Sequence, residues 1–178
     1  MSWAPRQDAE SGAFTSENAS GSGTLLFGRI THELMASYWP TPEAREALPV
    51  VAERMNGLPK VVFSSTLGEP SWQNTDVVRG DIEAVVERMK REPGPDMVVM
   101  GSGTIVAQLT DAKLIDEYQI VVVPIVLGRG RTMFDGVTAR VPLGLTDSRV
   151  FENGNVVLWY ERGEGNDGCR PTMDGRET

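Results

Sequence analysis

The segment spanning residues 97–109, MVVMGSGTIVAQL, constrains the fold of this chain more than any other stretch. Its first four residues are apolar and predict a short buried strand, whereas the residues from Ile105 onward predict a helix. A glycine-containing turn, Gly101-Ser102-Gly103-Thr104, joins the two directly. Such a junction presents backbone N–H groups and the positive end of the helix dipole, so it is suited to binding a phosphate. The turn matches neither the Rossmann nor the Walker A pattern, so a purely structural turn is the alternative.

Strands and helices alternate along most of the sequence, and only strands follow in its last part. The apolar patterns predict helices at 9–18, 30–38, 41–57, 81–91 and 103–111, with Pro49 disturbing the third of them. They predict strands at 24–27, 60–65, 76–78, 97–100, 117–127, 143–151 and 156–160, with Pro124 marking an edge position or a bulge. This order predicts an α/β protein of three layers, α-β-α, whose mixed, mostly parallel sheet is completed by antiparallel strands.

The length of 178 residues and the 40% content of hydrophobic residues are typical of one globular domain. We assign residues 1–162 to that domain and expect residues 163–178, which hold no apolar cluster, to be disordered. The N-terminal sequence has no apolar core of the kind found in signal peptides, and no run approaches the ~18 apolar residues of a membrane span. These features predict a cytoplasmic protein that does not contact the membrane.

The net charge of −8 argues against nucleic acid as a partner, because a general polyanion binder is normally basic. The same charge repels an anionic cofactor, so a phosphate site would need local cations and N–H donors. The chain has one histidine, His32, and one cysteine, Cys169. They provide neither a His/Cys cluster for zinc nor an internal disulfide, and we therefore expect no metal site.

Two further segments repeat the arrangement of a buried strand followed by a polar turn. After the strand at 24–27 come Gly28, Arg29 and Thr31, and after the strand that starts at Lys60 come the hydroxyls of Ser64 and Ser65. Arginine binds phosphate through a planar fork of N–H donors. A surface charge, a helix cap and the start of a turn are the structural alternatives at these positions. Because the carboxyl ends of strands line the ligand crevice of open α/β sheets, we expect the segments at 28–31, 64–65 and 101–104 to share one cleft.

Four segments together resemble the dihydrofolate reductase-like superfamily: LLFGRITHELMASYWP, KVVFSST, VVMGSGTIVAQL and LIDEYQIVVVPIVLGRGRTMF. The resemblance is closest to the C-terminal reductase domain of bacterial riboflavin biosynthesis and covers about residues 2–161. It implies a reductase that uses NADPH. It also implies that His32, at a position often held by an aromatic residue in the family, is a packing residue.

The resemblance assigns cofactor contacts to the three turns. It implies that Gly28, Arg29 and Thr31 bind the cofactor phosphates and that Ser64 and Ser65 receive the adenosine ribose phosphate. It implies that the pyrophosphate and nicotinamide side is contacted by Gly101, Ser102, Gly103 and Thr104.

Two departures from the family pattern concern the N-terminal part. The family opens with a central strand and a loop like S-L-D-G upstream of a tryptophan, whereas here Met1 closely precedes Trp3, so the first strand is expected to be missing. An abbreviated sequence, a segment from elsewhere in the chain or a strand from a second chain are the three explanations. Dihydrofolate reductases also place a catalytic carboxylate shortly after this tryptophan. Asp8 is the candidate for that acid, with a helix N-cap as the alternative role.

The functional hypothesis is an NADPH-dependent reductase of a small heterocyclic substrate, either pteridine-like or a ribosylaminouracil-type pyrimidine of riboflavin biosynthesis. Its role would be to hold the nicotinamide against the substrate, since the hydride chemistry belongs to the cofactor. The alternative is a non-catalytic nucleotide-binding or dimeric scaffold with the same fold. The resemblance also implies a homodimer, with the long C-terminal strands as the contact.

Overall fold

The computed structural model describes residues 9–20, 23–100, 102–130 and 132–163. Within these ranges no helix combines the length and the apolar character needed to cross a bilayer. The helices are α1 (Ala9–Ser20), α2 (Arg29–Ala36), α3 (Pro42–Ala47), α4 (Pro49–Gly57), α5 (Ile82–Arg91) and α6 (Gly103–Asp111). The strands are β1 (Gly23–Gly28), β2 (Lys60–Phe63), β3 (Thr75–Val78), β4 (Asp96–Val99), β5 (Glu117–Val122), β6 (Leu143–Val150) and β7 (Val156–Arg162).

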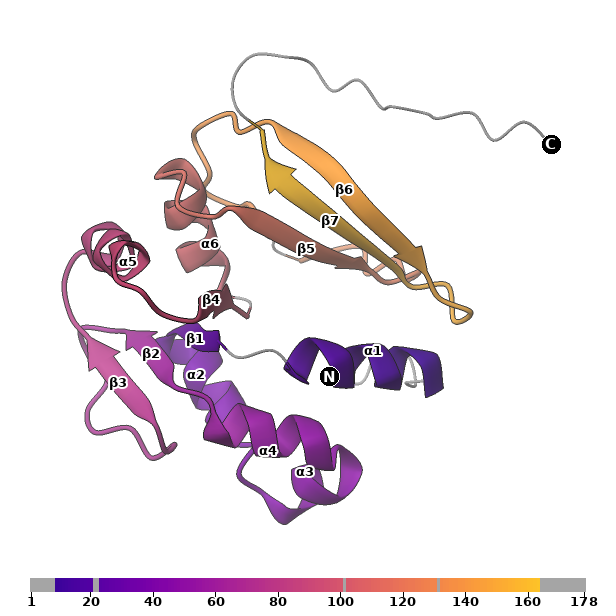
Figure 1. Ribbon diagram of the computed structural model, residues 1–178, viewed down its shortest axis with the longest axis horizontal. Coiled ribbons are helices and arrows are strands. Elements are labelled where there is room, and N and C mark those ends of the chain that lie inside the picture. Colours follow the sequence, from indigo (N-terminus) through magenta and orange to yellow (C-terminus); the bar gives the residue numbers. More distant parts are fainter. Residues whose placement is uncertain (1–8, 21–22, 101, 131, 164–178) are drawn as a thin grey trace.

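The described strands form two separate sheets (Figure 1). The first has the order β3-β2-β1-β4, and all of its neighbouring strands are parallel. The second has the order β5-β7-β6 and is antiparallel. The predicted fold class is therefore confirmed. The sequence pattern predicts one mixed sheet, whereas the described strands form two sheets that are separated between β4 and β5.

Both hydrophobic cores of the first sheet are built on β1 and β2. Because side chains alternate along a strand, Leu25 and Phe27 face one side and Leu26 faces the other. The first side packs against α2 and α4, where Val51 and Met55 are buried. The second side packs against α5 and α6, and its buried members include Val86, Ile105 and Leu109. Helices on both faces explain why β1 and β2 are apolar throughout, as parallel strands usually are.

Local signals set the helix ends. The Thr41 side chain accepts a hydrogen bond from the Ala44 N–H at 3.2 Å and starts α3, and the Asp81 carboxylate does the same for the Glu83 N–H at 2.9 Å at the start of α5. Pro49 begins α4 after a break at Leu48, which agrees with the expected disturbance.

The largest error in a predicted strand boundary is at the end of β5. The sequence pattern extends a strand over 117–127, whereas β5 ends at Val122. Proline has no backbone N–H to donate to a sheet, so the ladder ends just before Pro124.

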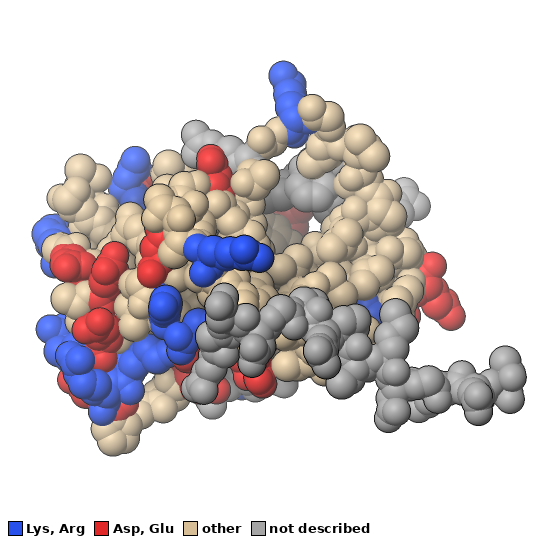
Figure 2. All heavy atoms as spheres, turned by 90° about the horizontal axis from the view of Figure 1, so that it is seen from above, with Lys and Arg blue, Asp and Glu red and all other residues tan. Residues whose placement is uncertain are grey.

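The charged side chains are unevenly distributed over the surface. Seen from above, Lys, Arg, Asp and Glu gather over the part of the molecule that holds α5 and the parallel sheet (left in Figure 2). The part over the antiparallel sheet is mostly uncharged (right in Figure 2).

Two titratable side chains are buried beside Trp72 under the first sheet. Lys60 is 1% exposed. Its Nζ donates hydrogen bonds to the carbonyls of Asn56 (3.1 Å) and Leu58 (2.7 Å), and the same Nζ lies 4.4 Å from the Trp72 ring centroid. Burial lowers the pKa of Lys60 to about 8. His32 is 2% exposed, and its ring centroid lies 5.7 Å from that of Trp72. Burial also lowers the pKa of His32, and the structure gives its two ring nitrogens no hydrogen-bond partner, so His32 is a neutral packing residue.

We expect the stability of the protein to rise with pH above about 8 through Lys60. Its pKa is lower in the folded protein, about 8, than in the unfolded chain, about 10.4. Between these values the unfolded state binds more protons, so the free energy of unfolding increases with pH, by up to about 3 kcal/mol. Lys60→Met removes this gain. Urea unfolding from about pH 6 to pH 10 measures the difference between the two proteins, with Lys113→Met as the control at an exposed lysine. A difference that does not change with pH would contradict the assignment.

Candidate functional site

The carboxyl ends of the four parallel strands share one edge of the first sheet. The register pairs Gly28 at the end of β1 with Phe63 at the end of β2, and Phe63 with Val78 at the end of β3. On the other side of β1, Leu26 pairs with Val99 at the end of β4. The turns that follow these strands therefore lie side by side at this edge, which we call the rim.

The turns after β1 and β4 are joined by two hydrogen bonds. The Gly28 N–H donates to the Ser102 Oγ at 2.8 Å, and the Ser102 hydroxyl donates to the Thr31 Oγ1 at 2.9 Å. Ser102 adopts a left-handed backbone conformation, with φ of 64°, which is uncommon for a residue other than glycine. A Cβ on Gly28 would lie 3.3 Å from the Ser102 Oγ, so the absence of a side chain at Gly28 permits this close approach.

Two helices start at these joined turns, and neither start is capped by a side chain. Gly28, the N-cap of α2, has no side chain, and the side chain of Ser102, the N-cap of α6, accepts no hydrogen bond from its own helix. The first-turn N–H groups of Gly103 and Thr104 thus lie at the positive end of the α6 dipole, and both residues are exposed. Two uncapped helix starts beside each other form an arrangement that favours an anion.

Arg29 brings a positive charge to the same place. Its guanidinium contacts the Glu33 carboxylate at 3.0 Å, and the two side chains are 43% and 48% exposed. An exposed pair of this kind stabilises a protein little, so a phosphate can compete with Glu33 for the guanidinium.

In the turn after β2, Ser64 has the structural role that the sequence analysis gave as its alternative, which is to start a turn. The Ser64 Oγ accepts hydrogen bonds from the N–H groups of Thr66 (3.2 Å) and Leu67 (2.9 Å) and so organises the turn. The side chain of Ser65 is exposed at the rim. The two serines therefore differ in role. The Ser64 hydroxyl holds the turn together, whereas the Ser65 side chain is exposed to solvent.

Arg79 is a rim residue that the sequence analysis missed. It directly follows β3, and its Nη2 donates to the Leu67 carbonyl at 3.0 Å, which holds it against the turn that contains Ser65. The sequence does show a cation immediately after the third strand. Its place beside the turn after β2 follows only from the pairing of β3 with β2.

Two predicted site residues, Asp8 and Gly101, lie outside the described residues. In the described ranges there is no group of three or more His, Cys, Asp or Glu that could hold a metal ion.

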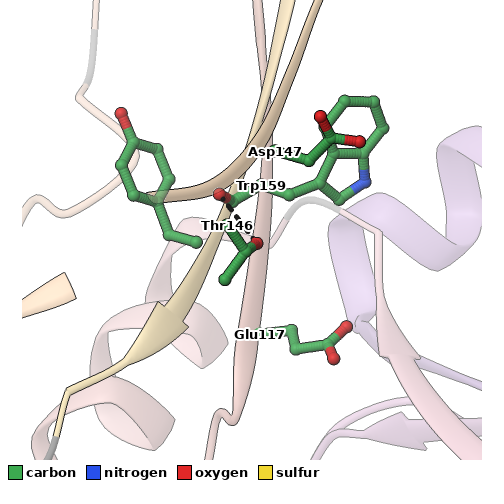
Figure 3. Close-up of a pocket in the computed structure, with 5 residues that line it drawn as sticks. Glu117, Thr146, Asp147 and Trp159 are labelled. Carbon is green, nitrogen blue, oxygen red and sulfur yellow. Dashed lines mark hydrogen bonds between the residues drawn. The ribbon is translucent and has the colours of Figure 1, made fainter. Parts of the chain in front are cut away.

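Two hollows in the described surface lie away from the rim. One, of about 190 Å³, is lined by Glu117, Thr146, Asp147, Trp159 and Tyr160 on the second sheet (Figure 3). Its volume is below the ~300 Å³ of the smallest usual ligand sites. The other, of about 480 Å³, is lined by residues that include Asn56 and Gly57. These residues precede β2, so this hollow lies toward the amino ends of the strands, opposite the rim.

We expect Ser102→Ala to destabilise the protein by about 1–2 kcal/mol, because it leaves the Gly28 N–H and the Thr31 hydroxyl without this partner. Thr104→Ala, at an exposed position in the first turn of α6, is the matched control and should change the free energy of unfolding by less than about 0.5 kcal/mol. Urea unfolding measures both. Equal effects of the two substitutions would show that the joined turns do not depend on the Ser102 hydroxyl.

Comparison with known families gives one match over most of the chain. The family described as the RibD C-terminal domain matches residues 2–157.

Two uncharacterized proteins of Bacillus subtilis strain 168 are similar in sequence. YyaP is 28% identical over 137 residues, which cover 77% of this chain and 72% of the relative. YwjB is 26% identical over 141 residues, which cover 78% of this chain and 73% of the relative.

Two solved structures are similar in fold. A protein named for riboflavin biosynthesis, from Shewanella sp. PV-4, has a TM-score of 0.66 at 20% identity, covering 90% of this chain and 84% of its own. A pyrimidine reductase-like protein from Corynebacterium diphtheriae has a TM-score of 0.60 at 10% identity, covering 93% and 86%. At these identities the likeness concerns the fold alone.

Proposed function

Because the chain belongs to the RibD C-terminal domain family, we propose that it is an NADPH-dependent reductase of a small heterocyclic substrate. The observation that carries the proposal is the joined pair of turns at the rim, where two uncapped helix starts meet beside Arg29. The chain has a net charge of −8, so an anionic cofactor needs this local concentration of N–H donors and cations.

The residues at the rim fit a dinucleotide phosphate. Gly103 and Thr104 would bind the pyrophosphate through the start of α6, with Arg29 as the nearby cation. Ser65 and Arg79, at the ends of β2 and β3, would bind the additional phosphate that distinguishes NADPH from NADH. The cofactor would supply the hydride, and these residues would hold it in position.

The substrate proposal is a pteridine-like ring or a ribosylaminouracil-type pyrimidine. The proteins of similar fold are named for riboflavin biosynthesis and for pyrimidine reduction, which agrees with that class. The substrate would lie at the nicotinamide end of the rim, on the side of Ser102 that faces away from Arg79. Asp8 is the proposed acid.

The second candidate function is a nucleotide-binding or dimeric scaffold without turnover. It is favoured by the break between the two sheets, which adjoins the turn after β4. The two candidates differ in NADPH oxidation, followed by absorbance, with pteridine and ribosylaminouracil substrates. Binding of NADPH without oxidation in the presence of either substrate class favours the scaffold.

We expect the protein to bind NADPH at sub-millimolar concentration, measured by energy transfer from tryptophan to the reduced nicotinamide. Arg79→Ala should weaken NADPH binding about tenfold, the effect of losing one charged hydrogen bond, and should leave NADH binding unchanged. Arg88→Ala, at an exposed arginine of α5, is the matched control.

Two results would contradict the proposal. The absence of saturation at about 1 mM NADPH would reject the cofactor. An equal loss of NADPH and NADH affinity in Arg79→Ala would reject the role of this residue in distinguishing them.

We also propose a homodimer through the face of the second sheet opposite α1. The register places Val122, Val156 and Val150 in one row on this face, and Tyr160 and Leu145 in another. Tyr118 lies in the second row but is buried beside Thr110 of α6, so it is not part of the proposed contact. Val150 is 71% exposed and Leu145 is 57% exposed. Contiguous exposed apolar residues of this kind are typical of protein interfaces.

The double substitution Leu145→Lys and Val150→Lys should convert the dimer to a monomer, because it places two charges on this face of each subunit. Light scattering coupled to size-exclusion chromatography measures the mass. Glu43→Lys, at an exposed position of α3, is the control and should stay dimeric. A monomeric wild-type protein at about 100 μM would reject the dimer.

A further inference from the structure

We propose that the hollow of about 480 Å³ opposite the rim is a second binding site, and that its ligand is a small zwitterion, a free α-amino acid. The carboxylate of the amino acid would contact Arg45, and its ammonium group would contact Glu53. The inference goes beyond the proposed function, and its test uses no cofactor.

The first observation is the size and shape of the hollow. Its volume lies within the range of ~300–1,000 Å³ that is usual for small-molecule sites. Four lining residues, at positions 49, 53, 56 and 57, recur with the spacing of one stripe along α4. The hollow therefore follows α4, which packs beside α3 (Figure 1). Arg45 of α3 and Gln73, from the segment before β3, complete the lining.

The second observation is a pair of opposite charges on the walls. Arg45 is exposed in the last turn of α3, and Glu53 is exposed one turn after Pro49 in α4. The ion pairs between described residues use neither side chain. A guanidinium binds a carboxylate through a planar fork of donors, and a carboxylate accepts charged hydrogen bonds from an ammonium group. The hollow thus offers one free partner to each charge of a zwitterion.

The third observation is the polarity of α4, which matches the order of these charges. α4 begins at Pro49 without a side-chain cap, so the N–H groups of its first turn add a partial positive charge to the end of the hollow near Arg45. Glu53 follows one turn later. A carboxylate is therefore favoured at the start of α4 and a cationic group further along it. A simple anion or cation would leave Glu53 or Arg45 without a complementary charge.

The fourth observation is that hydrogen bonds fix the floor of the hollow. Asn56 is 8% exposed, and its Oδ1 accepts a hydrogen bond from the Trp72 Nε1 at 2.7 Å. Its main-chain carbonyl accepts from the Lys60 Nζ at 3.1 Å, the Gln73 Nε2 at 3.1 Å and the Asn74 Nδ2 at 3.2 Å. Groups held in this way do not need to be ordered by the ligand, so the hollow is preorganised for binding.

Gly57 leaves room for the side chain of the amino acid. It lines the hollow at the end of α4, and a Cβ built on it would meet no atom within 4 Å. With the carboxylate at Arg45 and the ammonium group at Glu53, the side chain would extend along α4 toward this open space.

The test is the titration of the full 178-residue protein with L-leucine, L-alanine and L-glutamine in separate experiments, followed by amide NMR. At least one should shift the amide signals of Glu53 and Gly57 with a Kd at or below about 1 mM, whereas the signal of Thr104 at the rim should not move. The N-acetyl derivative lacks the ammonium group and the amide derivative lacks the carboxylate, so each should bind at least about tenfold more weakly. No saturable shift at about 10 mM of any of the three, or equally tight binding of acetate, would overturn the proposal.

Substitutions in the hollow provide a second test. Gly57→Leu should abolish binding, because its side chain would occupy the open space. Gly68→Leu is the matched control, at a glycine whose Cβ would also meet no atom within 4 Å, and neither glycine has a positive φ. Arg45→Gln should weaken binding at least about tenfold, and Arg88→Gln, at an exposed arginine of α5, should leave it unchanged. Circular dichroism establishes that the variants are folded. Equal affinities of each variant and its control for the amino acid would reject the site.

Discussion

The parallel pairing of β1 with β2 on one side and with β4 on the other is the constraint on which the rest of the structure depends. β1 contributes Leu25, Leu26 and Phe27, all at most 3% exposed, to the cores on both faces of the sheet. The same pairing brings the ends of β1 and β4 together, so that Gly28 and Ser102 can bond. Packing and the candidate site therefore have a common origin in one buried strand.

Electrostatics divide the molecule into regions with different roles. The rim concentrates N–H donors and the cations Arg29 and Arg79 in a chain whose net charge is −8. Lys60, by contrast, is buried, and its ammonium is satisfied by main-chain carbonyls and the Trp72 ring. A lysine in that setting connects α4 to the strands and takes no part in the rim, because it enters β2 from the opposite end.

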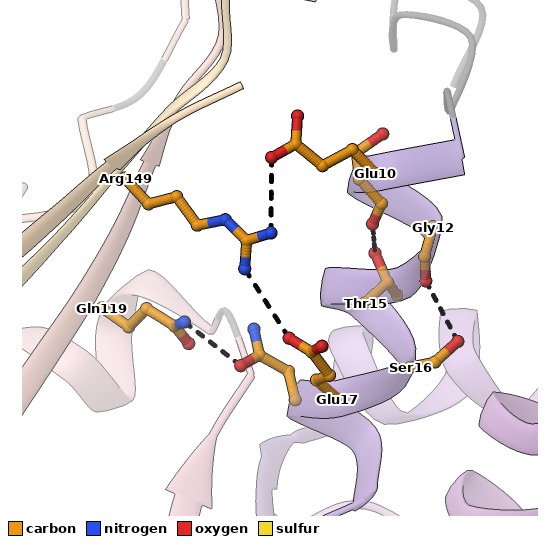
Figure 4. A network of polar contacts seen from close by, with 9 residues as sticks. Glu10, Gly12, Thr15, Ser16, Glu17, Gln119 and Arg149 are labelled. Atoms are coloured by element: carbon orange, nitrogen blue, oxygen red, sulfur yellow. Dashed lines mark hydrogen bonds and ion pairs between the residues drawn. The ribbon is translucent and has the colours of Figure 1, made fainter. Parts of the chain in front are cut away.

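The second sheet is held to the first by helices. α6 contacts both sheets, and α1 covers the opposite face with aromatic packing and the ion pairs of Arg149 with Glu10 and Glu17 (Figure 4). This explains how two sheets with no hydrogen bonds between their described strands keep a common layered arrangement. It also leaves apolar side chains of β4 and β5 partly exposed along the break between the two sheets.

The sequence by itself determined the order and type of nearly all elements, and the polar turns after β1, β2 and β4. These features depend on contacts within a few residues, which periodicity and capping patterns record. Only the tertiary structure decided which strands are neighbours, and so revealed Arg79 beside the turn after β2 and the division of the sheet beside β4. It also decided which side of α2 is buried, since Ile30 is 73% exposed although His32 is buried. Strand pairing and helix docking depend on residues far apart in the chain, and local patterns contain no record of them.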